Sequence, residues 1–199
     1  MKTAALALTL VIIAVAGTSA HADDRHDRGG NRFATELSGY NEVHFIFSTA
    51  TTPPTAALRG AVSTAASGSF KARIDDDAQT IQYELSYADL EGSVTQAHIH
   101  FGQKHTVGGI VVWLCETDAA QHPVPALRRP VTPQCPQSGT VTGTIGPDKV
   151  IDVPGQGIAP GEFVELVRAI RAGATYANVH SSLFPPGEIR GHIGHGEHE

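Results

Sequence analysis

The chain has few cysteines, few aromatic residues and no long apolar run beyond its N-terminus. Its 199 residues include 2 cysteines, 1 tryptophan and 1 methionine. A Gly-x-Ser-x-Gly elbow, a phosphate-binding glycine loop and a His-Glu-x-x-His motif are all missing, which leaves hydrolase and nucleotide-binding functions without support. Positive charge is also scarce, since 14 Lys and Arg stand against 20 Asp and Glu. Nucleic acid is therefore not an expected partner.

The N-terminus has the layout of a secretory signal peptide. Lys2 precedes an apolar run from Ala4 to Ala16, and small residues follow as far as Ala22. This run is shorter than the roughly 20 residues that a membrane-spanning helix needs. We expect a signal peptide over 1–22, cleavage after Ala22, no membrane insertion, and an exported product that is periplasmic or secreted. The remaining chain is long enough for one domain and short for two.

Short alternating runs dominate the rest of the sequence. After a charged, glycine-containing segment at 23–32, apolar and polar residues alternate in ten stretches separated by turn residues. Many short strands of this kind are typical of a β-sandwich or barrel. We predict an all-β domain over 33–194, followed by a His- and Glu-rich tail at 195–199. The predicted strands cover 33–37, 42–47, 57–63, 67–74, 80–87, 95–101, 109–114, 139–145, 175–180 and 188–193.

One segment has helical rather than strand periodicity. Pro160-Gly161-Glu162 leads into apolar residues spaced three and four apart, and Gly173 follows the last of them. We predict a short amphipathic helix that packs on the core, with a partner-binding helix as the alternative. The apolar positions are Phe163, Leu166, Val167 and Ile170.

Cys115 and Cys135 enclose most of a proline-rich segment at 116–138. In an exported protein an even pair of cysteines is most simply a disulfide, and metal-binding free thiols are the alternative. The prolines exclude a long regular strand or helix from this segment. We therefore expect a long loop pinned by the disulfide, serving either as a binding surface or as decoration of a sheet edge.

Histidine is unusually common, with 11 residues, and its sharpest pattern is Ala97-His98-Ile99-His100. On a strand, His98 and His100 share one face about 7 Å apart, and they could chelate a metal ion. Two histidines on a solvent-facing strand would give the same pattern. His180, in an apolar context at the end of a later strand, is a candidate third ligand, and His105 is a candidate fourth. Histidine-only coordination suits copper or zinc better than calcium or magnesium.

The last predicted strand places Glu188, Arg190 and His192 on one face. If that face borders the histidines, Arg190 could attract an anion and Glu188 could orient an imidazole ring. Ordinary solvent-facing strand residues are the alternative. A supporting role around the metal is favoured over direct ligation for all three.

Three motifs together resemble the CHRD (chordin-type) domain family. They are ELSGYNEV at 36–43, AHIH at 97–100, and NVH at 178–180 with FPPGEIRG at 184–191. The resemblance covers about residues 33–193 and implies a Greek-key β-sandwich found in exported proteins, without an established activity. It also implies that His98, His100 and His180 are the histidines shared by the family.

The segment His98-Ile99-His100-Phe101-Gly102 is also distantly similar to the copper strand of copper/zinc superoxide dismutase. The proline-rich segment at 116–138 has no counterpart of the dismutase zinc loop, so this similarity does not imply a two-metal site. We predict an exported protein that binds copper, or zinc, through His98, His100 and His180, for copper handling or redox chemistry. As an enzyme it would act on a small anion such as superoxide. The alternative is a non-catalytic extracellular module that binds a protein or glycan partner.

Overall fold

The computed structural model describes residues 30–48, 55–117 and 131–195, with side chains described outside 45–59. Strands dominate this part of the chain, which confirms the predicted all-β fold. The strands are β1 (Arg32–Ser38), β2 (His44–Ser48), β3 (Thr55–Gly60), β4 (Ser67–Asp75), β5 (Thr80–Ala88), β6 (Val94–Phe101), β7 (Gly109–Glu116), β8 (Gly139–Ile145), β9 (Thr175–Ser181), β10 (Ile189–His192) and β11 (Gly194–His195). The helices are η1 (Gly39–Asn41), η3 (Pro147–Lys149) and α1 (Phe163–Arg171).

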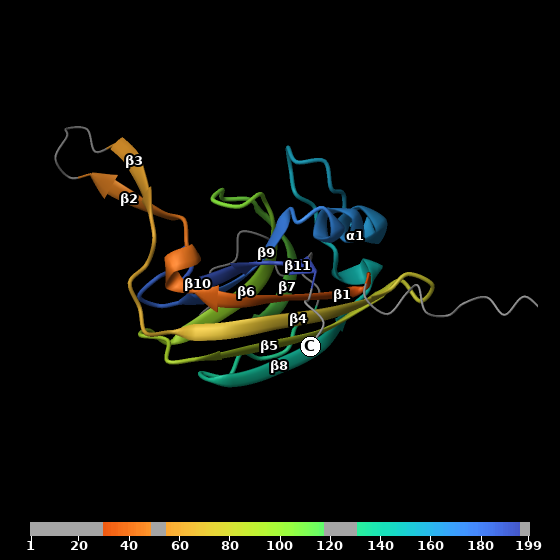
Figure 1. Cartoon of the computed structure of the whole chain (residues 1–199), viewed down its shortest axis with the longest axis horizontal. Coiled ribbons are helices and arrows are strands. Elements are labelled where there is room, and N and C mark those ends of the chain that lie inside the picture. The colour runs from red at the N-terminus through yellow and green to blue at the C-terminus, as the bar shows by residue number, and fades with distance from the viewer. Residues whose placement is uncertain (1–29, 49–54, 118–130, 196–199) are drawn as a thin grey trace, which may run out of the picture.

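One antiparallel sheet forms the body of the protein. Its strands follow the order β7-β6-β9-β10-β1-β4-β5-β8, and β11 pairs with β1. Several neighbours are far apart in sequence, such as β6 with β9 and β5 with β8, as in Greek-key folds. The β2–β3 hairpin forms a separate sheet and projects from the body (Figure 1).

The two ends of this sheet meet, so that the sheet is nearly closed on itself. Cys115, on β7, forms a disulfide with Cys135, which precedes β8. This disulfide confirms the predicted pairing. The hydroxyl group of Tyr83, on β5, donates a hydrogen bond to the carbonyl of Leu114 on β7 at 2.7 Å. Tyr87, also on β5, donates a second one to the carbonyl of Pro136 at 2.7 Å. The disulfide and Tyr83 thus join the β6–β7 end to the β5–β8 end, and Tyr87 holds the segment next to Cys135 against β5.

The helix α1 forms where the apolar spacing predicts it, and its stripe packs on the core. Five of its side chains are buried, and the exposed positions include an Arg168–Glu165 ion pair at 2.7 Å. The helix lies over one end of the sheet (Figure 1). Its buried residues are Phe163, Leu166, Val167, Ala169 and Ile170.

All ten predicted strands are present, with ends that differ by a few residues. The two-residue strand β11 (Gly194–His195) was not predicted, because it lies where the predicted domain meets the predicted His- and Glu-rich tail. The predicted signal peptide, most of segment 23–32 and residues 196–199 lie outside the described residues. No helix in the part of the chain that the structure describes is long and apolar enough to cross a membrane.

The sheet has two regions whose outer faces differ. On β4 and β5 buried and exposed positions alternate, so that one face packs on the core and the other meets water. On β9 every residue is buried, and β6 is buried except for partly exposed Phe101. Both faces of the β6–β9 region are therefore covered, although one of them carries polar side chains.

Candidate metal centre

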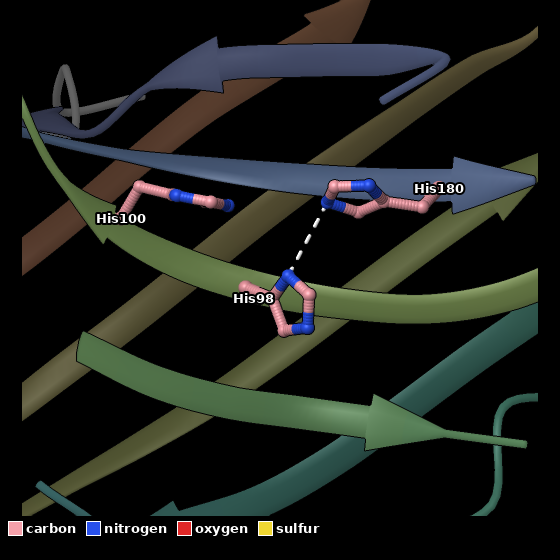
Figure 2. A group of neighbouring side chains, drawn as sticks. All are labelled: His98, His100 and His180. Carbon is pink, nitrogen blue, oxygen red and sulfur yellow. Dashed lines mark hydrogen bonds between the residues drawn. The ribbon is translucent and has the colours of Figure 1, made fainter. Parts of the chain in front are cut away.

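The pairing of β6 with β9 brings three histidines together from distant parts of the chain. His98 lies opposite Asn178 and His100 lies opposite Tyr176, while His180 is two residues further along the same face of β9. Figure 2 shows His98 and His100 on β6 and His180 on β9 gathered in one cluster. Their relative exposures are 0%, 7% and 5%, and one ring nitrogen from each lies within 4.8 Å of the others.

Backbone carbonyls orient two of the three imidazoles. His100 donates from Nδ1 to the carbonyl of Gly108 at 3.0 Å, and His180 donates from Nδ1 to the carbonyl of Pro185 at 2.8 Å. Because a carbonyl can only accept, Nδ1 carries the proton and Nε2 carries the lone pair in each neutral ring. Both rings therefore present a metal-binding nitrogen to the cluster, as metal-ligating histidines in proteins commonly do.

One pair of nitrogens already has the spacing expected around a metal ion. Nδ1 of His98 forms a hydrogen bond with Nε2 of His180 at 3.2 Å (Figure 2), and a metal ion would take the place of the shared proton. Two nitrogens bound at about 2.0–2.1 Å to one tetrahedral ion would be about 3.3 Å apart. Nε2 of His100 is buried and has no hydrogen-bond partner among the described residues. A buried nitrogen without a partner is costly, and a metal ion would satisfy it.

Burial keeps these rings in the neutral form that binds metal. Desolvation and, to a smaller extent, the neighbouring His180 lower the pKa of His100 to about 3. Desolvation likewise lowers the pKa of His180 to about 4, while the hydrogen bond to Pro185 opposes that shift. Since metal binding requires a deprotonated ring nitrogen, both histidines can bind at neutral pH without losing a proton.

Two aromatic rings enclose the cluster. The Tyr176 ring stacks on His100 with centroids 4.7 Å apart and parallel planes. Trp113, on β7, contacts His98 at 4.2 Å in an edge-to-face arrangement. Both were missed in the sequence analysis. Tyr176 could have been found by alternation, since it lies four residues before His180 on the same strand face.

A buried polar network adjoins the cluster on the β10 side. Asn178 donates from Nδ2 to Glu42 and to the carbonyl of Ile189 at 2.9 Å. Burial raises the pKa of Glu42 to about 7, while the nearby Arg190 opposes the shift. The Arg190 guanidinium lies over the Tyr176 ring, 4.2 Å from its centroid. Glu42 and Asn178 were also missed, although both lie in the motifs quoted for the family resemblance.

The remaining predicted residues lie around the cluster rather than in it. His105 is exposed and borders a cavity shared with Arg190 and His192, outside the three-histidine group. The His192 ring is 5.9 Å from the Tyr176 ring. The Glu188 side chain is buried and accepts hydrogen bonds through Oε1 from the Thr64 hydroxyl at 2.8 Å and the Glu91 amide at 2.7 Å. Arg190 and His192 thus adjoin Tyr176, whereas the hydrogen bonds of Glu188 go to other loops.

Comparison with known families supports the resemblance based on the motifs. The CHRD domain family matches residues 33–193, which include all three histidines. Searches of curated proteins and of solved structures found no match. The similarity to superoxide dismutase therefore gains no support from either search. Because the family match covers most of the chain, this protein belongs to the CHRD domain family.

Proposed function

We propose that this protein binds one copper ion through His98, His100 and His180 and serves in copper handling outside the cytoplasm. The observation that carries this proposal is the convergence of three imidazole nitrogens within 4.8 Å in a buried site. Histidines on a solvent-facing strand would not need hydrogen bonds to backbone carbonyls such as those of Gly108 and Pro185, and would not be shielded from water.

The donor set favours copper. Three nitrogen ligands with no carboxylate oxygen among them suit copper or zinc and not calcium or magnesium. Among divalent first-row metals, copper binds a given nitrogen site most tightly, with zinc weaker. In this proposal His100 and His180 contribute Nε2, and His98 contributes Nδ1. When bound, copper would supply one-electron redox chemistry, and the surrounding aromatic rings would limit the access of water.

The proposed location outside the cytoplasm has two supports. Disulfides persist mainly in oxidising compartments, and Cys115–Cys135 is formed in the structure. The N-terminal sequence has the signal-peptide pattern of a basic residue, an apolar run and small residues before Asp23.

A redox activity on a small anion such as superoxide is a second candidate. Its support is Arg190, a cation that contacts Tyr176 directly beside His100. Activity would be worth measuring only after copper binding has been established. The alternative of a non-catalytic module that binds a protein or glycan would gain support if the metal experiment failed.

The proposal is tested by copper titration of the mature, untagged protein with elemental analysis. We expect one tightly held copper per chain, and loss of that copper in His98→Ala/His100→Ala. A chelator of moderate affinity should be present, so that weak binding by the terminal histidines does not count. Zinc titrated in the same way tests the choice of metal.

His105→Ala is the matched control, because it removes an exposed histidine close in sequence but outside the cluster. It should retain the copper. Circular dichroism must show that each variant is folded before its metal content is compared. Equal copper content in wild type and the double variant would overturn the proposal.

A further inference from the structure

A small cavity next to the β10 strand is lined by cationic and hydrogen-bonding side chains. Its volume is about 200 Å³. Two of the lining residues, Arg190 and Lys104, are basic, and within residues 30–48, 55–117 and 131–195 no carboxylate lines the cavity. The lining residues are Thr35, Asn41, Lys104, His105, Arg190 and His192. This concentration of positive charge contrasts with the net charge of −6 of the whole chain.

Arg190 is held in place rather than mobile in solvent. It is 4% exposed, its guanidinium stacks on Tyr176, and it donates one hydrogen bond to the carbonyl of Thr106 at 3.0 Å. A guanidinium has five N–H donors. Among the described residues, the bond to Thr106 is the one hydrogen bond that the Arg190 side chain donates to the protein. Within the same residues, no carboxylate forms an ion pair with Arg190 within 4.0 Å. A buried cation in this state has donors available for a ligand.

The Glu42 carboxyl group does not neutralise Arg190 fully. Glu42 acts on Arg190 through space, but burial raises the Glu42 pKa to about 7. Near neutral pH a large fraction of Glu42 is therefore uncharged. The positive charge of Arg190 is then left for a partner that enters the cavity.

We propose that this cavity binds a small oxyanion, with a phosphate-like or carboxylate head, between Arg190 and Lys104. Arginine presents paired donors that match the oxygens of such a group, and lysine adds a point charge. Asn41 and Thr35, from the N-terminal part of the sequence, also line the cavity and offer further hydrogen-bonding groups.

The size of the cavity limits the ligand. Pockets for drug-sized ligands occupy about 300–1,000 Å³. At about 30 Å³ per water, the cavity holds on the order of six or seven waters. An inorganic oxyanion or a short carboxylic acid fits this volume, whereas a nucleotide does not.

This anion site is independent of the proposed copper site. None of the residues that line the cavity is His98, His100 or His180. The metal-free protein should therefore bind the anion, since the anion titration requires no copper. Failure of copper binding and failure of anion binding can thus be told apart in the same preparations.

The test is calorimetric titration of the metal-free mature protein with phosphate, sulfate and acetate at constant ionic strength. Chloride serves as the reference anion. We expect saturable binding at one site for phosphate, acetate or both. The stronger of the two tells whether the natural ligand carries a phosphate-like or a carboxylate head.

Lys104→Gln is the main variant, because Lys104 is exposed and its replacement should leave the fold intact. We expect it to weaken binding about fivefold, as for an exposed charge pair. Arg190→Gln should weaken binding at least tenfold, because hydrogen bonds to buried charges are stronger. Should Arg190→Gln fail to fold, Lys104→Gln still decides the proposal.

Lys71→Gln is the matched control, since Lys71 is an exposed lysine on β4 and does not line the cavity. It should leave anion affinity unchanged. Two results would overturn the proposal. One is the absence of saturable binding for every anion, and the other is an equal loss in Lys71→Gln and Lys104→Gln.

Discussion

Polar and apolar residues alternate in the sequences of both the β4–β5 region and the β6–β9 region of the sheet. The polar face is exposed in the first region and buried in the second. On β4 and β5, side chains such as Lys71, Gln82 and Glu84 point into water. On β6 and β9, the corresponding face carries His98 and Asn178, and it is buried.

The covering of the β6–β9 region comes from three connecting segments. The 102–108 loop accepts a hydrogen bond from His100, and the 182–187 turn accepts one from His180. The segment around η1 supplies Glu42, which accepts a hydrogen bond from Asn178. Alternation in a sequence thus identifies which residues share a strand face, whereas the packing of the connecting segments determines whether that face is exposed to solvent. Polar groups removed from water need partners. Here the connecting segments supply them, two from close in sequence and one, Glu42, from 136 residues away.

The disulfide joins the two regions, and its loss should have the largest effect on stability. Reduction of Cys115–Cys135, which encloses a sequence separation of 20 residues, should lower the free energy of unfolding by about 3 kcal/mol. Urea unfolding of the metal-free protein with and without a reducing agent measures this change. Cys115→Ala/Cys135→Ala is the control, and its midpoint should not respond to the reducing agent.

The contrast between the two polar faces can be tested with Asn178→Ala and Gln82→Ala. Asn178→Ala should destabilise the protein by about 2 kcal/mol, because it leaves buried acceptors on Glu42 and Ile189 without a donor. Gln82→Ala, on the exposed face of β5, should change stability by no more than about 0.5 kcal/mol. If urea unfolding shows that both substitutions lower the free energy of unfolding equally, the proposed difference between the buried and the exposed polar face is wrong.

The buried face should also make stability depend on pH through Glu42. Its pKa is about 7 in the folded protein and 4.5 as the reference value, so the folded state binds more protons between these limits. Stability should therefore fall as the pH rises from about 4.5 to 7, by at most about 1.4 kcal/mol per pH unit. Glu42→Gln, which stays neutral, should lose this dependence.

The measurement for Glu42 is the unfolding midpoint of the metal-free protein at pH 5, 6 and 7. The difference between wild type and Glu42→Gln isolates the contribution of this carboxyl from those of other titrating groups. A difference that is constant across the three pH values would show that Glu42 does not titrate in this range.

Much of the fold could be predicted from sequence because alternation and turn residues are local signals. The strand that carries His98 and His100 and the helix at Phe163–Arg171 are examples. The histidine cluster could be predicted in part, because the family resemblance and the strand geometry selected the same residues. Tyr176 could have been found by alternation, whereas Glu42 could not, since its approach to Asn178 depends on how distant segments pack.

His105 illustrates the limit of reasoning from proximity in sequence. It lies five residues after His100 and was the predicted candidate for a fourth ligand. In the structure the connecting loop continues past it, and the carbonyl of Gly108 contacts the His100 ring instead. Distance along the chain alone could not show which group of this loop, the His105 ring or the Gly108 carbonyl, would lie next to His100.

The separation of His98 and His180 by 82 residues bears on the order in which the protein assembles. His98 and His100 lie on a local hairpin with β7, whereas β9 follows β8 and α1 in the chain. Pairing over such long separations is slow compared with hairpin formation. A chain that has not yet docked β9 offers only the His98–His100 pair. Occupancy by all three histidines would therefore report that folding is complete.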